Sequence, residues 1–88
     1  MASMFYVYVL YSREADKFYI GYSADLKRRM REHTSGTSLS GRTIKNLRLV
    51  YYEACLSKKD AQLQEKQLKT GFGRQYLRKR LQSSIPPP

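Results

Sequence analysis

The side chains best suited to chemistry in this sequence are two tyrosines, an arginine and a histidine in its first half. Tyr8 and Tyr19 lie in the short aromatic runs FYVYVLYS and FYIGYS, and Arg29 and His33 follow in ADLKRRMREHTSG. A phenol, a guanidinium and an imidazole can together bind a phosphate group and move protons around it. These four side chains act together only if the elements that carry them place them on one side of the molecule.

Two predicted strands carry the tyrosines. Residues 5–11 and 18–22 are rich in aromatic and β-branched side chains, and the polar residues 12–17 between them suit a hairpin turn. Tyrosine is common in strands as a packing residue. The functional alternative is that both phenols point to one side of the sheet and bind or deprotonate a water. An unperturbed phenol has a pKa of about 10, so it is a poor base unless a cation lowers that pKa.

A helix is predicted to follow the second strand, over residues 24–34, with Ser23 as its N-cap. Four of its side chains share one face at positions i, i+3, i+4 and i+7, namely Leu26, Arg29, Met30 and His33. Arg29 is therefore expected to point inward, where its guanidinium could hold a phosphate. The alternatives are a solvated basic face for the arginine and a helix-capping role for the histidine.

The rest of the chain predicts a third strand over residues 47–55, expected to be the central one, and two more helices. The first begins after Ser57 and ends near Thr70 at Gly71, and Gly73 allows a turn into the second, over residues 74–81. The order β-β-α-β-α-α predicts an α+β domain with a three-stranded antiparallel sheet. We interpret four aromatic residues as packing rather than base-stacking side chains: Tyr51, Tyr52, Phe72 and Tyr76.

Glu65 is the most informative candidate outside the strands. Ala61, Glu65 and Leu68 recur at i, i+4 and i+7, so the carboxylate is on the apolar face of its helix. A carboxylate seldom lies on such a face without a partner or a metal ion. A salt bridge, for example to Arg29, and a role as metal ligand therefore both remain open.

Composition limits the class of protein. The chain has 88 residues, 41% hydrophobic residues and a formal net charge of +10, which predicts one small folded domain that favours a polyanionic partner. A basic surface that merely aids solubility is the alternative. The single Cys55 excludes an internal disulfide, and no apolar run is long enough to span a membrane. The start of the chain does not resemble a signal peptide, so we expect a cytoplasmic location.

The ordered set of motifs resembles the GIY-YIG nuclease domain. Tyr6-Val7-Tyr8 stands in the place of GIY, and Tyr19-Ile20-Gly21 is an intact YIG. The likeness continues through LKRRMREH, LVYYE and EKQLKTGFGR and covers about residues 4–82. It extends above all to the small stand-alone bacterial members of the family. We expect residues 1–4 to be a leader or tag remnant, residues 5–82 the domain and residues 83–88 a disordered tail.

The resemblance implies a metal-dependent endonuclease that hydrolyses structured or duplex DNA, in repair or recombination. It implies that Tyr8 and Tyr19 line the site, that Arg29 holds the phosphate and that His33 faces it. We take Tyr8 as the base and Tyr19 as a positioning group. Glu65 would be the ligand of Mg²⁺ or Mn²⁺. Six basic residues would extend the DNA-binding surface: Arg28, Arg31, Arg42, Lys45, Lys69 and Arg74.

Three features depart from the family pattern. Tyr6 replaces the first glycine, Tyr22 stands where some relatives carry a lysine, and no clear asparagine follows the helix of Glu65. Two other functions therefore remain open beside the nuclease. One is a nucleic-acid-binding module of the same fold without catalysis, and the other is a small protein-interaction or regulatory domain. The sequence does not determine the oligomeric state.

Overall fold

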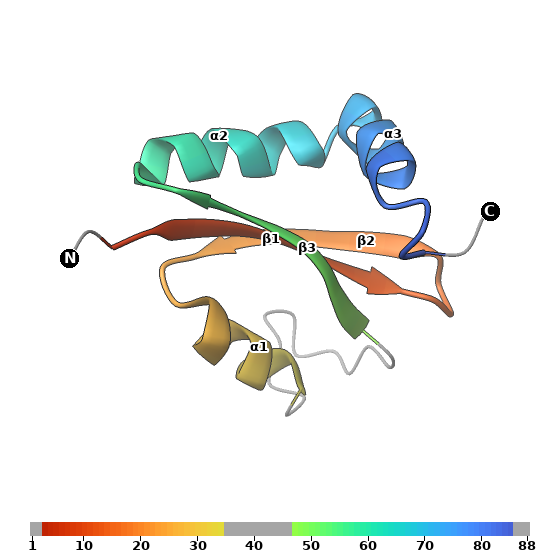
Figure 1. Cartoon of the computed structure of the whole chain (residues 1–88), viewed down its shortest axis with the longest axis horizontal. Helices are drawn as coiled ribbons and strands as arrows, with labels where there is room; N and C mark the ends of the chain where they lie inside the picture. Colours follow the sequence, from red (N-terminus) through yellow and green to blue (C-terminus); the bar gives the residue numbers. More distant parts are fainter. Residues whose placement is uncertain (1–2, 35–46, 86–88) are drawn as a thin grey trace.

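The computed structural model describes residues 3–34 and 47–85. Within them a three-stranded antiparallel sheet has the order β2-β1-β3, and the elements follow the predicted order β-β-α-β-α-α. The strands are β1 (Phe5–Ser12), β2 (Lys17–Ser23) and β3 (Leu47–Cys55). The helices are α1 (Leu26–Thr34), α2 (Lys58–Leu68) and α3 (Gly71–Arg80). Figure 1 shows α2 and α3 over one face of the sheet and α1 on the other.

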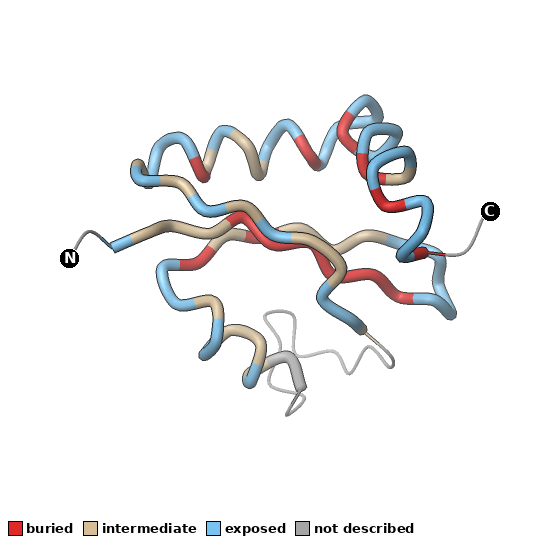
Figure 2. Tube along the Cα trace, in the orientation of Figure 1, coloured by how far each residue is buried: buried red, intermediate tan, exposed pale blue. Residues whose placement is uncertain are grey.

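The core lies between the sheet and the α2–α3 layer. Val7, Val9 and Tyr11 alternate along β1 and point to this side. They pack with Ala61, Leu68, Leu77, Leu81 and Ile85 of the C-terminal half. Figure 2 shows the buried residues gathered along β1 and on the inner sides of α2 and α3. The odd-numbered residues of β1 therefore build the core, and the even-numbered ones face α1.

The expectation that residues 47–55 form the central strand is wrong, because β1 occupies that position and β3 is an edge strand. Residues 7–12 of β1 are all buried, as expected of a strand with neighbours on both sides and helices on both faces. Half-buried and exposed residues are mixed along β3, and its register against β1 shifts between Val9 and Leu10. A shift of this kind marks a β-bulge, which bends the edge strand.

The helix starts also differ from the prediction. Asp25, not Ser23, caps α1, since its Oδ1 accepts the N–H of Arg28 at 3.0 Å. The Ser23 hydroxyl instead binds the backbone of Asp25, accepting its N–H and donating to its carbonyl, at 3.0 Å each. Gly71 does not end a helix but begins α3, whose N-cap Thr70 accepts the N–H of Gly73 at 3.1 Å.

Glycine at position 73 has a steric cause. A Cβ there would lie 2.5 Å from both the Cα and the carbonyl oxygen of Leu68, so only glycine lets α3 begin this close to the end of α2. Beyond α3, Ile85 is buried in the core and donates its N–H to Leu81 at 3.0 Å. Within the described ranges, no helix has the length and apolarity to cross a membrane.

Candidate active site

The site is built around Tyr8, which lies directly opposite Gly21 in the β1–β2 register. A Cβ added to Gly21 would lie 2.5 Å from the Tyr8 hydroxyl and 2.7 Å from its Cζ. The phenol therefore crosses the bare backbone of Gly21, and its hydroxyl rests over the edge strand β2. The glycine of the YIG motif is required here because any side chain would displace the tyrosine.

Tyr19 lies on the same face of the sheet as Tyr8. It precedes Gly21 by two residues and pairs with Leu10, so strand alternation directs both phenols to the side of α1. Tyr8 is almost fully buried, whereas Tyr19 is half-buried. Tyr22 points the other way, since its hydroxyl accepts a hydrogen bond from Gln62 of α2 at 3.2 Å. The family's lysine position is thus filled by a side chain directed away from Tyr8.

Arg29 comes to the site from α1. Its Nη1 lies 3.4 Å from a carboxylate oxygen of Glu32, one turn further along the helix, and its side chain is 21% exposed. Its Nε is buried and has no hydrogen-bond partner among the described residues. A guanidinium group has five N–H donors, so Arg29 keeps donors that a bound anion can use.

Glu65 comes to the site from α2, on the other face of the sheet. As the helical spacing predicts, it shares a face with the buried Ala61 and Leu68, and its side chain is 20% exposed. Its carboxylate pairs with Lys69 at 3.1 Å, one turn later, and not with Arg29. The alternative of an Arg29–Glu65 salt bridge is therefore not what the structure contains.

Charges from two helices influence the Tyr8 phenol. Burial raises the pKa of Tyr8, and the positive charge of Arg29 opposes that rise. The negative charges of Glu65 and Glu32 raise the pKa further. Arg29 of α1 and Glu65 of α2 thus both act on one phenol, although their helices cover opposite faces of the sheet.

The donor set suits a hydrated hard cation and not a closed metal cage. In the described part of the chain, no group of three or more His, Cys, Asp and Glu side chains could hold a metal ion. Glu65 offers one hard carboxylate whose charge influences Tyr8, and the side chain of its partner Lys69 is 55% exposed. Mg²⁺ commonly binds in this way, through one or two carboxylates, several waters and substrate phosphates. The residues present therefore fit such an ion.

The other predicted residues that the structure describes are spread over several elements. Arg28 and Arg31 are exposed on α1, Arg74 is exposed on α3, and Lys69 pairs with Glu65. The side chain of His33, together with Arg42 and Lys45, lies outside the described residues. The helical position of His33, one turn after Arg29, agrees with the predicted spacing.

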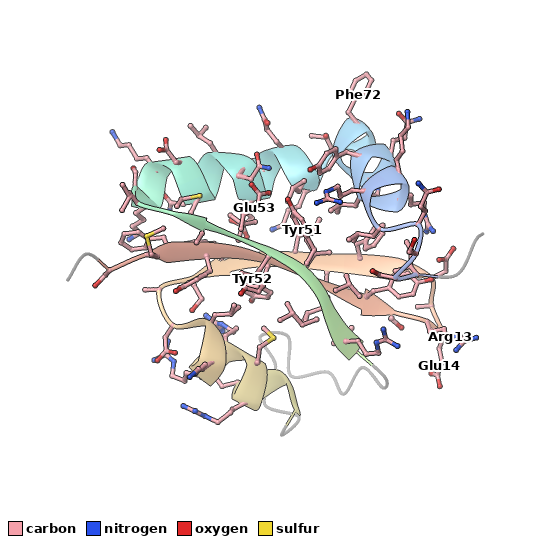
Figure 3. All side chains as sticks on the ribbon, in the orientation of Figure 1. Arg13, Glu14, Tyr51, Tyr52, Glu53 and Phe72 are labelled. Atoms are coloured by element: carbon pink, nitrogen blue, oxygen red, sulfur yellow. The ribbon has the colours of Figure 1, made fainter. Side chains whose placement is uncertain are left out.

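Two features of this region were not expected from the sequence. Glu32 acts on both Arg29 and Tyr8, and its position three residues after Arg29 is the signal that could have identified it. The interpretation of the aromatic residues as packing holds for Tyr51 but is wrong for Tyr52 and Phe72, which are 54% and 86% exposed. Tyr52 contacts Tyr6 with ring centroids 6.1 Å apart, and Figure 3 shows it on the side of the sheet that faces α1.

A comparison with protein-family models matches residues 4–81 to the GIY-YIG catalytic domain. The chain belongs to the GIY-YIG family. Its domain type is that of a nuclease family, whose members generally depend on a divalent metal ion.

A solved structure supports the same assignment. The chain is 31% identical to a UPF0213 protein from Bacillus halodurans, whose solution structure superposes with a TM-score of 0.53. The match covers 84% of this chain and 81% of that protein. No curated protein matches significantly. This GIY-YIG domain therefore has a relative of similar size and fold.

Proposed function

We propose that this chain is a divalent-metal-dependent endonuclease that hydrolyses DNA phosphodiester bonds, selects DNA by structure and acts in repair or recombination. One observation carries the proposal. The Tyr8 hydroxyl lies over Gly21, and the charges of Arg29 and Glu65 act on it from two separate helices. Membership of a nuclease family and the net charge of +10 support the same conclusion.

Arg29 is the group that would hold the scissile phosphate. Its contact with Glu32 is long, at 3.4 Å, and its buried Nε has no partner among the described residues. Donors that are already fixed near the reacting group stabilise the charge that develops in the transition state without further reorganisation. The forked guanidinium can also contact two phosphate oxygens at once, which orients the phosphorus for attack.

Tyr8 would hold the attacking water. Burial and the nearby carboxylates raise its pKa, so the phenol is protonated at neutral pH in the free protein. Its oxygen can accept a hydrogen bond from the attacking water in that state. It can act as a base only after it has released its own proton to solvent, and it then takes up the proton of the attacking water. The positive charge of Arg29 favours that loss. Tyr19, on the same face, would position the water, and His33 would give a proton to the leaving oxygen.

Glu65 would bind the metal ion. Its carboxylate reaches the neighbourhood of Tyr8 and is held by an exposed lysine, which a cation can displace. A bound Mg²⁺ or Mn²⁺ would supply a Lewis acid for the phosphate oxygens. Six basic residues would contact the DNA backbone, as expected from the sequence: Arg28, Arg31, Arg42, Lys45, Lys69 and Arg74.

A nucleic-acid-binding module without catalysis is the second candidate. Two observations favour it. The Glu65 carboxylate is already paired with Lys69, and the raised pKa of Tyr8 keeps its phenol protonated, so neither group is ready for catalysis. Such a module would lose affinity steeply with added salt, and metal ions would not affect its binding.

Cleavage of labelled single-stranded, duplex, flap and branched DNA, with Mg²⁺, Mn²⁺ or EDTA, tests the proposal. The wild type is compared with Glu65→Gln and with Asp60→Asn, which removes an exposed carboxylate one turn earlier on α2. We expect metal-dependent cleavage by the wild type and Asp60→Asn. Glu65→Gln should lose cleavage while binding DNA normally in EDTA.

The other outcomes are equally informative. Undiminished cleavage by Glu65→Gln would remove this residue from the mechanism. No cleavage by the wild type on any substrate, together with salt-sensitive binding, would favour the binding module.

A further inference from the structure

A second surface with its own chemistry lies between α2 and α3. It is a groove of about 510 Å³ with Leu68 at its base, and we call it the α2–α3 groove. Its volume lies within the range typical of ligand sites. Gln64, Gln67 and Thr70 supply its polar groups, and Phe72 and Tyr76 supply aromatic rings.

The α2–α3 groove and the candidate active site use opposite flanks of α2. Gln64, which lines the groove, donates to Glu53 of β3 at 2.8 Å. Gln62, on the other flank, donates to Tyr22 of β2. Glu65 and Lys69 lie on that second flank by helical spacing. A strand that leaves Tyr8 and Glu65 would have to cross α2, a helix about 10 Å in diameter, to reach the groove.

The two aromatic rings of the groove are exposed. Phe72 is 86% exposed, and Figure 3 shows it standing out from α3 away from the sheet. Tyr76, one turn later, is 45% exposed. Burial, followed by the neighbouring Tyr76 and Glu53, raises the pKa of Tyr51, so the Tyr76 phenol lies near that residue of β3. Two exposed rings one helical turn apart, both lining the groove, offer faces on which a flat group can stack.

The charged and polar residues around the two rings indicate which flat ligand would stack there. Lys79 is exposed and lies at i+7 from Phe72, so it shares the stripe of the two rings, in a domain with a net charge of +10. Amide and hydroxyl groups of Gln67 and Thr70 border the same space. Aromatic faces, amides and a nearby cation together suit a base linked to a phosphate, because every base has a stacking face.

We propose that the α2–α3 groove binds an unpaired nucleobase of a nucleic-acid strand, with Phe72 and Tyr76 stacking on the base and Lys79 contacting its phosphate. This proposal rests on the nuclease function proposed above and deepens it. An unpaired base can enter the groove without the cost of breaking a base pair. The groove would therefore give the enzyme a preference for DNA with a single-stranded segment next to the bond that is cut.

Fluorescence anisotropy of a short fluorescein-labelled oligothymidylate, in EDTA so that no cleavage occurs, tests the groove. A blunt duplex with the same number of nucleotides per strand is the second probe. The variants are Phe72→Ala, Phe72→Leu and Phe72→Tyr. The control is Leu63→Ala, which truncates an apolar side chain of α2 that is 61% exposed and does not line the groove.

We expect Phe72→Ala to weaken binding of the single strand about tenfold or more. Phe72→Leu should lose nearly as much, because it keeps an apolar contact without a ring, and Phe72→Tyr should bind as the wild type does. Leu63→Ala should bind as the wild type does, and no variant should change binding of the duplex. Thermal melting of each variant shows that a loss is not due to unfolding.

Three results would overturn the groove as a base site: equal affinity of Phe72→Ala and the wild type for the single strand, normal binding by Phe72→Leu, or equal losses on duplex and single strand. Since the assay excludes cleavage, its outcome is independent of the nuclease assay. If the protein cuts DNA but the Phe72 variants bind normally, only the base-binding proposal is wrong. If the groove binds a base but the protein never cuts DNA, only the proposed catalysis is wrong.

Discussion

Two clusters of this domain contain the same kinds of side chain, a tyrosine, an arginine and carboxylates, yet their arginines make different contacts. At the end of the β1–β2 hairpin, Tyr11 donates to Asp16 at 2.6 Å, and Arg78 approaches the same carboxylate at 3.0 Å. At the candidate active site, Tyr8 is surrounded by the charges of an arginine and two glutamates, and Arg29 makes one ion pair at 3.4 Å.

The two clusters differ in the partners that each arginine contacts. Arg78 also lies over the ring of Phe18, 5.3 Å from its centroid, and donates to the Asp16 carbonyl at 3.4 Å, although its Nη1 lacks a partner among the described residues. These contacts tie α3 to the hairpin. Among the described residues, the Arg29 guanidinium pairs with Glu32 alone, at 3.4 Å. Arg78 thus joins two elements and fixes the fold, whereas Arg29 pairs within its own helix and its buried Nε can bind a ligand.

The two tyrosines give the sharpest comparison and the largest expected effect. Tyr8→Phe should lower the cleavage rate by about 10²–10⁴-fold if its hydroxyl takes part in proton transfer, with little change in melting temperature. Tyr11→Phe should leave cleavage intact and lower the melting temperature, because Asp16 loses a hydrogen bond. Cleavage kinetics and thermal melting of both variants measure this. The comparison fails if the two variants lose activity equally.

Substitutions of the two arginines should differ in the same way, one affecting cleavage and the other stability. Arg29→Ala removes donors aimed at the phosphate, so we expect the cleavage rate to fall by about 10²–10³-fold. Arg78→Ala should change the cleavage rate little but destabilise the hairpin. A single-turnover assay and urea unfolding report the two quantities. Normal cleavage by Arg29→Ala would show that this arginine is structural, like its counterpart.

Substitutions at two glycines test whether the Tyr8 phenol packs as tightly against Gly21 as the geometry indicates. A methyl group at Gly21 meets the Tyr8 hydroxyl at 2.5 Å, so Gly21→Ala should cost about 1–3 kcal/mol in unfolding free energy and displace the phenol. Gly71→Ala is the matched control, because nothing lies within 4 Å of its added Cβ. Calorimetry of both proteins measures the difference. Equal stability of the two variants would contradict a tight contact.

The smallest expected effect concerns pH. Hydrogen bonds from Tyr11 and Arg78 lower the pKa of Asp16, so its contribution to stability is present above its unfolded pKa and is lost as the pH falls through the lower folded value. Asp16→Asn should melt slightly below the wild type at pH 7, and the difference should vanish in acid. Asparagine tolerates the backbone φ of 51° at this position. A pH-independent difference would indicate a cause other than charge.

Local patterns predicted most of the elements and the shared face of the tyrosines. Aromatic and β-branched runs identified all three strands, and alternation directed Tyr8 and Tyr19 to one side. The spacing of Ala61, Glu65 and Leu68 correctly predicted a carboxylate on the inner face of α2. The motif order was sufficient to recognise the GIY-YIG family, because several short patterns occurred in the right sequence.

Properties that depend on distant partners could not be predicted in the same way. Strand order follows from which strand has neighbours on both sides, and only the unbroken apolar character of residues 7–11 hinted that β1 is central. The contact of Arg78 with Asp16 joins residues 62 positions apart, and no local pattern indicates it. The capping role of Asp25 was a choice between two polar residues two positions apart, Ser23 and Asp25, that only backbone geometry decides.

The central position of β1 also has a consequence for the order in which the site is assembled. Tyr8 and Gly21 belong to one hairpin, so they can meet through local chain closure. Glu65 joins only after β3 has paired across a long connection and α2 has docked, which are slower, non-local events. Pulse-labelled amide exchange should therefore protect the hairpin before α2. The chain would acquire its phenol early in folding and its candidate metal ligand late, so a partly folded molecule would lack the means to cut.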